Sequence, residues 1–242
     1  MLRFCLTGHA RGSQNLRRMS SAAASVLPEC VCVHCGQRFN AQHLTYGVDV
    51  SALPTELAEC FTQLDRDADA HAFLLSCGSK SRAVRLAQSA AASLLRSSMS
   101  LTDANGVLGR GELHVLSQPQ ATLLLGDAAG GVLLDVGAGD GSVTSRLAPL
   151  FAAVVATEVS APMLRRLRAR GFAAVLETES VCGAAAAARA QGVPVDEGGF
   201  DVVSCLNVLD RCDSPLALLA DLRALVKPDT GRLLLAVVLP FR

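Results

Sequence analysis

Blocks of apolar and polar residues alternate along the second half of the chain, and their lengths predict strands and helices in turn. Five short apolar runs have the length of buried strands, and they cover residues 132–136, 153–157, 172–176, 200–206 and 233–239. Between them, apolar residues recur at helical spacing in segments 142–151, 162–170 and 214–226. The alanine-rich stretch 183–190 fits either a helix or a low-complexity insertion. This alternation predicts an α/β fold with a doubly wound, mostly parallel sheet and right-handed crossovers.

The first half of the chain has a more helical pattern. Apolar residues recur at helical spacing from Pro54 to Met99, which predicts two or three helices packed onto the main domain. Ser100 to Asp103 then resembles a helix start, and Gly109-Arg110-Gly111 makes a basic turn. Arg110 is either part of an ordinary connector or a guanidinium that pairs with a carboxylate at a site. We therefore expect an N-terminal extension (1–45), a helical extension (46–120) and an α/β domain (121–242).

A glycine-rich turn follows the first of the five predicted strands. Gly137, Gly139 and Gly141 open a predicted helix, and Asp135 and Asp140 lie beside them in the sequence. Glycines let a ligand approach the backbone closely, and a helix start offers free N–H groups. A dinucleotide fingerprint would read Gly-x-Gly-x-x-Gly, and acids suit an amine-bearing ligand better than a pyrophosphate. S-adenosylmethionine carries an ammonium and a sulfonium and no phosphate. The turn therefore predicts a methyltransferase, with a dinucleotide enzyme or a ligand-free tight turn as the alternatives.

Polar residues at two other strand ends are predicted to join this turn. Ligands of doubly wound sheets bind at the carboxyl ends of the strands. Glu158 follows the second strand at about the interval expected for an acid that accepts ribose hydroxyls, and the alternative is a surface acid. Asn207 and Asp210 follow the fourth strand, as site residues or as ordinary polar loop residues.

Composition excludes several classes of protein. Half of the 242 residues are hydrophobic, but aromatic residues make up only 4% and Trp is absent, so the core must consist of Leu, Val and Ala. The formal net charge is zero, which gives no support to binding of nucleic acid or of a membrane surface. The nine cysteines are scattered, which is typical of reduced, intracellular thiols. No apolar run reaches the ~18 residues of a membrane-spanning helix.

Two features near the N-terminus have open interpretations. Residues 1–28 contain four arginines and no acid before Glu29, which is typical either of a mitochondrial presequence or of an unstructured start. A compact cluster of Cys30, Cys32, His34 and Cys35 follows, with His43 further on. A closed zinc site usually needs two well-separated ligand pairs, so the spacing favours unpaired thiols over a metal site.

Four segments and the C-terminal tail carry a resemblance to a known family. They are Asn105 to Gly111, Asp135 to Gly141, Ala156 to Glu158, Ser204 to Asp213, and Leu239-Pro240-Phe241. On these segments the chain resembles the DREV family of methyltransferases, from about Ser98 to the C-terminus. The glycine turn indicates only the broad class, whereas the Gly-Arg-Gly segment and the Asn-x-x-Asp-Arg-Cys-Asp run are much more specific.

The resemblance implies a class I, Rossmann-like methyltransferase fold with S-adenosylmethionine as the cofactor. It implies methylation of the pros nitrogen of histidine in His-x-His motifs of proteins, where x is a small residue. Six positions are then expected to bind the cofactor, namely Asp135, Gly137, Gly139, Asp140, Glu158 and Asn207. Asp210 is expected to be the catalytic residue that faces the substrate imidazole, and Arg110 to bind substrate as well.

The chain departs from the family in two places. The alanine-rich stretch is longer than in family members, so the contact on the adenine side is unassigned. The sequence also stops at Arg242, where family members continue through two further strands and a tyrosine-bearing segment, so we expect the fifth strand to keep an exposed edge. The alternatives to a histidine methyltransferase are a methyltransferase of the same fold with another substrate and a non-catalytic, truncated relative.

Overall fold

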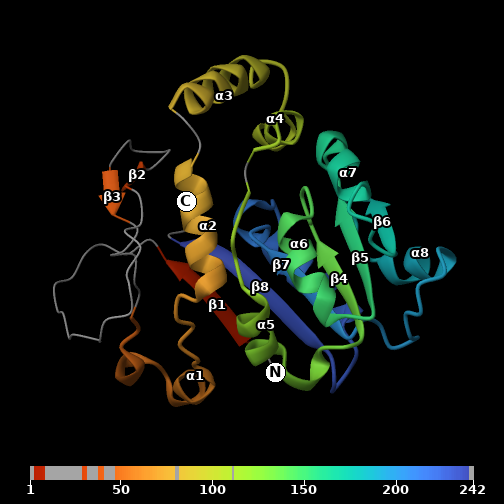
Figure 1. Cartoon of the computed structure of the whole chain (residues 1–242). Coiled ribbons are helices and arrows are strands. Elements are labelled where there is room, and N and C mark those ends of the chain that lie inside the picture. Colours follow the sequence, from red (N-terminus) through yellow and green to blue (C-terminus); the bar gives the residue numbers. More distant parts are fainter. Residues whose placement is uncertain are drawn as a thin grey trace. The chain divides into compact units, whose positions relative to one another are not determined.

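The computed structural model describes residues 3–8, 29–31, 38–40, 47–79, 82–110 and 112–239, and these divide into two compact units (Figure 1). One unit contains Met1–Thr7 and Leu86–Arg242, and the other contains Gly8–Arg85. Several residues singled out in the sequence lie outside the described residues, namely most of the arginine-rich start (9–28), Cys32, His34, Cys35, His43, Gly111, Pro240 and Phe241.

The larger unit is built on one sheet with the strand order β1-β8-β7-β4-β5-β6. Its strands are β1 (Arg3–Gly8), β4 (Val132–Val136), β5 (Ala153–Glu158), β6 (Ala174–Glu177), β7 (Val202–Leu206) and β8 (Arg232–Leu239). The five strands from β8 to β6 pair in parallel. The chain leaves β4 in one direction through β5 and β6 and returns to its other side as β7 and β8. The sheet therefore reverses its strand order at β4, and the predicted doubly wound fold is confirmed.

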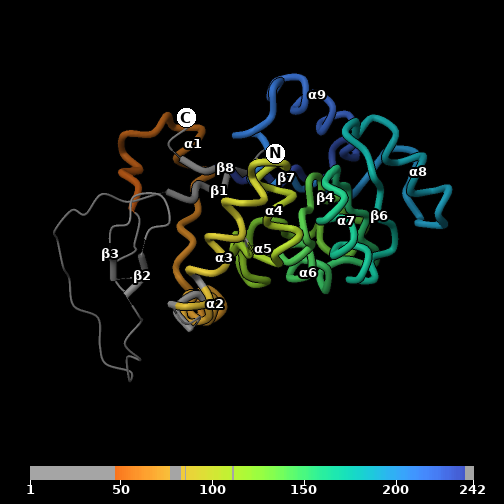
Figure 2. Tube along the Cα trace, turned by 90° about the horizontal axis from the view of Figure 1, so that it is seen from above, coloured from red at the N-terminus to blue at the C-terminus, as the bar shows by residue number. Residues whose placement is uncertain are grey.

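Helices cover both faces of this sheet (Figures 1 and 2). α6 (Ser142–Leu147) and α7 (Ala161–Arg168) lie on one face, and α8 (Ala184–Ala190) and α9 (Pro215–Leu225) lie on the other. Because both faces are covered, every residue of β4 and β7 is buried, which explains why each strand is apolar apart from one polar residue, Asp135 or Ser204. The buried hydrophobic residues of the described chain are Leu, Val and Ala, apart from Phe200 and Cys205.

Several element boundaries differ from the expectation. The helix after β4 ends at Leu147 instead of Phe151, because Pro149 lacks the N–H that would continue it, and a single 3-10 turn (Ala148–Leu150) follows. The third and fourth predicted strands begin at Ala174 and Val202, each two residues later than expected. α7 ends at Arg168, two residues earlier than expected.

One helix was not predicted. α5 (Gln118–Leu125) begins with a capping box between Ser117 and Gln120, in which each side chain accepts the backbone N–H of the other residue. The Ser-x-x-Gln pattern is the sequence signal for this start.

α4 (Leu101–Leu108) begins at the predicted cap Ser100 and packs on α7. The two helices approach closely at Gly106, where an added Cβ would lie 2.8 Å from the Cβ of Pro162. Nε of Arg166 also donates a hydrogen bond to the carbonyl of Gly106, at 2.5 Å.

The expectation of an exposed edge at β8 is wrong, because β1 pairs beside β8 in the sheet. The sequence signal was hidden in the arginine-rich start, whose composition indicated a presequence or an unstructured segment instead of a strand.

The smaller unit contains an antiparallel pair of short strands and two helices. Its elements are β2 (Glu29–Val31), β3 (Arg38–Asn40), the 3-10 turn η2 (Val50–Ala52), α1 (Thr55–Cys60) and α2 (Ala68–Ser79). α3 (Arg82–Leu95) begins in this unit and ends in the larger one. None of the helices in the described part of the chain is both long enough and apolar enough to cross a membrane.

Candidate functional site

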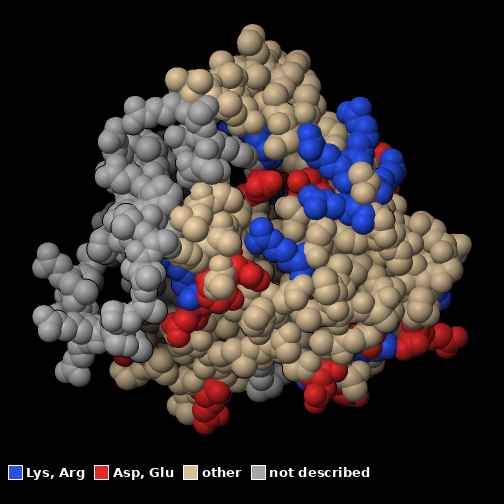
Figure 3. Space-filling view, viewed as in Figure 1, with Lys and Arg blue, Asp and Glu red and all other residues tan. Residues whose placement is uncertain are grey.

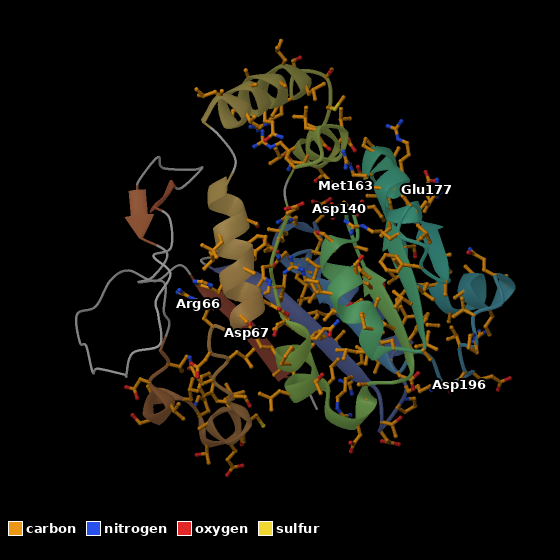
Figure 4. All side chains as sticks on the ribbon, in the orientation of Figure 1. Arg66, Asp67, Asp140, Met163, Glu177 and Asp196 are labelled. Carbon is orange, nitrogen blue, oxygen red and sulfur yellow. The ribbon has the colours of Figure 1, made fainter. Side chains whose placement is uncertain are left out.

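A cavity of about 830 Å³ lies at the carboxyl ends of β4, β5 and β7, with α4 on one side of it. It is lined by most of the predicted site residues, namely Arg110, Asp135, Gly137, Gly139, Asp140, Glu158 and Asn207. Figure 4 shows two lining residues, Asp140 and Met163, near each other at this end of the sheet, whereas Asp196 lies at the opposite end. In Figure 3, acidic side chains gather around a hollow below α4, and basic side chains of α7 lie beside it.

The glycine turn forms the floor of the cavity. Gly139 has a φ of +60°, a left-handed conformation that side chains other than glycine rarely adopt. An added Cβ at Gly139 would meet no atom within 4 Å, so the turn leaves open space at the point where a side chain would project.

Glu158, the last residue of β5, is buried and holds three backbone N–H groups. Its Oε2 accepts from Gly139 N at 2.8 Å, and its Oε1 accepts from Val159 N at 2.9 Å and Ser160 N at 2.8 Å. Each carboxylate oxygen has two lone pairs, so Oε2 can accept one further donor from a ligand. Glu158 thus joins the glycine turn to the start of α7.

Asp135 is 2% exposed, and both of its carboxylate oxygens are bonded within the protein. Oδ2 accepts from the hydroxyl of Thr144 at 2.5 Å, and Oδ1 accepts from the hydroxyl of Ser204, its cross-strand neighbour on β7, at 2.6 Å. Burial raises the pKa of Asp135 to about 6, although the two hydroxyls lower it. This acid therefore ties β4 to α6 and β7 as well as lining the cavity.

Asp140 lies just before the start of α6 and contacts both the first residue of that helix and Arg170, which follows α7. Its Oδ1 accepts from Ser142 N at 2.9 Å, and its Oδ2 lies 3.5 Å from Nη2 of Arg170. The Nε of Arg170 also donates to the backbone carbonyl of Asp140. Both acids that accompany the glycines thus have partners within the protein.

Asn207 and Asp210 each have one buried side-chain oxygen, Oδ1, without a hydrogen-bond partner in the described part of the chain. Asn207 has a φ of +60°, which is uncommon for a residue other than glycine and is concentrated at functional sites. Asp210 lies in the 3-10 turn Leu209–Arg211 and does not line the cavity itself, although its neighbour Arg211 does. Its Oδ2 lies 3.9 Å from Nε of Arg211.

Arg110 lines the cavity beside α4. Its Nη1 donates to the backbone carbonyl of Gln88 at 2.9 Å, which fixes the side chain while leaving further guanidinium N–H groups unused by that bond.

Asp103 is a cavity residue that no sequence motif indicated. Asp103 lies in the first turn of α4 and lines the cavity. Hydrogen bonds from the hydroxyl of Ser160 and, to a smaller extent, of Ser100 hold its pKa below the ordinary value. The bond to Ser160 spans 57 positions, so only the local Ser100 to Asp103 cap was visible in the sequence.

A second cavity, of about 350 Å³, adjoins the first. Both are lined by Gly137, Glu158 and Val208, and the second continues past Thr178 to Leu218. Within the described residues, no group of three or more His, Cys, Asp and Glu side chains is arranged to hold a metal ion.

Comparison with known proteins assigns the chain to a family. The family model of DREV methyltransferases matches residues 45–242. A ubiquinone biosynthesis O-methyltransferase of Xanthomonas oryzae is 28% identical over 116 residues, which are 46% of this chain and 45% of that protein. The chain therefore spans less than half the length of this relative.

Two solved structures show partial likeness. Magnesium protoporphyrin IX methyltransferase from Synechocystis PCC 6803 with bound SAM is 17% identical, with a TM-score of 0.35, over 55% of this chain and 71% of the other. The DhpI-SAH complex is 20% identical, with a TM-score of 0.35, over 60% of this chain and 65% of the other. The family match carries more weight than these likenesses because it extends over most of the chain. The chain belongs to the DREV methyltransferase family.

Proposed function

We propose that this protein methylates the pros nitrogen of histidine in His-x-His motifs of proteins. The observation that carries the proposal is the pair Asn207 and Asp210, which follow β7 and each keep a buried oxygen without a partner in the described residues. Leaving a buried acceptor unsatisfied costs about 1–3 kcal/mol, and a bound ligand would supply the missing donor.

The cavity fits the cofactor in three respects. The space in front of Gly139 is open, so a ligand can approach the backbone there. Oε2 of Glu158 retains acceptor capacity for ribose hydroxyls, and the acids around the cavity suit a cation. The second cavity then suits the adenine ring, since Val181, Val208 and Leu218 give it apolar walls.

When bound, S-adenosylmethionine supplies a methyl group on a positively charged sulfur. In our proposal, Asn207 and the glycine turn hold the methionine part of the cofactor, with Asp135 and Asp140 keeping the turn in place. Asp210 accepts the N–H of the substrate imidazole, which leaves the lone pair of the other ring nitrogen free to react. The same carboxylate stabilises the positive charge of the methylated ring, and Arg110 contacts the substrate chain.

The test separates catalysis from cofactor binding by replacing Asp210 with Asn. Asp210→Asn should keep the Kd for S-adenosylhomocysteine within a few-fold and lower methyl transfer to a His-Ala-His peptide by ~100-fold or more. Asn207→Ala should instead weaken cofactor binding, by roughly 10-fold. Asp213→Asn is the matched control, because Asp213 is an exposed acid three residues further on.

Two outcomes contradict the proposed roles. If Asp210→Asn loses cofactor binding in parallel with activity, Asp210 is a cofactor ligand. If activity survives intact, the histidine-directed mechanism loses its main local support.

A further inference from the structure

A chain of hydrogen bonds joins α4 to the acid at the end of β5. Oδ1 of Asp103 accepts from the hydroxyl of Ser160 at 2.6 Å. The backbone N–H of Ser160 in turn donates to Oε1 of Glu158 at 2.8 Å, and Oε2 of Glu158 accepts from Gly139 N. All four residues line the larger cavity, so the chain runs along its wall from α4 to the glycine turn.

Further local hydrogen bonds fix the first two residues of this series, Asp103 and Ser160. Ser100 holds the carboxylate of Asp103, because its hydroxyl donates to Oδ2 at 2.8 Å and accepts from Asp103 N at 3.0 Å. Ser160 is buried and caps α7 by accepting from the N–H of Met163, the residue labelled in Figure 4. Ser160 thus links the two acids, because its hydroxyl bonds to Asp103 and its backbone N–H bonds to Glu158.

We infer that Asp103 is a positioning residue for recognition of the cofactor ribose. It holds Ser160, and through Ser160 it fixes the carboxylate of Glu158 in the orientation in which Oε2 meets the ribose hydroxyls. The packing of α4 on α7 and the recognition of the ribose are therefore coupled through Asp103 and Ser160. This inference rests on the proposed role of Glu158, and it is independent of which substrate receives the methyl group.

The experiment compares binding of S-adenosylhomocysteine with binding of its 2′,3′-dideoxyribose analogue, which lacks the hydroxyls in question. In the unaltered protein the analogue should bind about 10-fold more weakly. Asp103→Ala should bind S-adenosylhomocysteine about 5-fold more weakly and the analogue nearly as before, so that the ratio of the two dissociation constants falls to about 2. Asp103→Asn should restore the ratio, because its amide oxygen still accepts from Ser160.

Arg166→Ala is the matched control. Arg166 also joins α7 to α4, through the carbonyl of Gly106, but it takes no part in the chain to Glu158. It should leave the ratio near 10 even if it lowers Tm. Ser160→Ala removes the same hydrogen bond from the other side and should lower the ratio as Asp103→Ala does, which provides a second variant if one of them unfolds.

The outcomes separate this inference from the role of Glu158. A ratio that stays near 10 in both Asp103→Ala and Ser160→Ala overturns the inference alone. An equal loss of affinity for both ligands in Asp103→Ala and Asp103→Asn also overturns it, because a direct or merely structural role would act that way. If the unaltered protein itself binds both ligands equally, Glu158 does not recognise the ribose and the inference falls with that role.

Discussion

Replacing Asp135 with asparagine should remove a pH-dependent contribution to the stability of the sheet. Burial raises the pKa of Asp135 from 3.8 to about 6, with the hydroxyls of Ser204 and Thr144 opposing the shift and the charge of Glu158 adding to it. In the unfolded chain the carboxyl loses its proton near its ordinary pKa. Between these two pH values the folded protein therefore holds a proton that the unfolded chain has released.

The sign and size of the effect follow from this difference. The free energy of unfolding falls as the pH rises, by up to ~1.4 kcal/mol per pH unit while only the folded state is protonated. Over the interval from 3.8 to about 6 the loss adds up to about 3 kcal/mol. The contribution of Asp135 is fully present below pH ~4 and is lost as the pH rises through ~6. Asn at this position is neutral throughout and has no such slope.

Urea unfolding between pH 4 and 7.5 measures the effect, followed by far-UV circular dichroism because the chain contains no Trp. The free energy of unfolding of Asp135→Asn minus that of the unaltered protein should rise by about 3 kcal/mol across this range. Asp127→Asn, which removes an exposed acid, is the control substitution. A flat difference for Asp135→Asn would refute the argument that burial raises this pKa.

Two further substitutions test the cavity and the packing of α4 on α7. Gly139→Val should abolish the thermal shift with S-adenosylhomocysteine, which otherwise stabilises by ~2.7 kcal/mol at 100 times its Kd, because the side chain fills open space in the cavity. Gly106→Ala should lower the free energy of unfolding by ~1–3 kcal/mol, since its Cβ would lie 2.8 Å from that of Pro162. Gly183→Ala, with nothing within 4 Å, should change it by less than ~1 kcal/mol. Equal effects of the last two substitutions would argue against the close approach of α4 and α7.

Local patterns in the sequence predicted individual strands and helix starts. The run from Val132 to Val136 became β4 with the same bounds, because a strand buried on both faces needs a mostly apolar segment. Ser100 and Ser160 were predicted as helix starts and cap α4 and α7, since a cap depends on a side chain and an N–H three residues later.

Contacts between distant segments could not be predicted in this way. Asp135 was expected beside the cofactor from its position near the glycines, but its bond to Ser204 depends on β7 pairing with β4, 69 positions along the chain. The bond from Gly139 N to Glu158 likewise depends on β5 pairing with β4, 19 positions along the chain. Around Asp103, the local cap by Ser100 could be predicted from the sequence. The bond from Ser160, which lies far away in the sequence, could not.

Identification of the methylated atom tests the proposed function most directly. The protein is incubated with methyl-labelled S-adenosylmethionine and a His-Ala-His peptide, in parallel with an Ala-Ala-Ala peptide and a phenolic acceptor of the kind used by O-methyltransferases. The site of the label in each product is then determined by NMR. We expect the label on the pros nitrogen of histidine and none on the other two acceptors. Label on the phenolic oxygen, or no transfer to histidine while S-adenosylhomocysteine binds, would contradict a histidine methyltransferase.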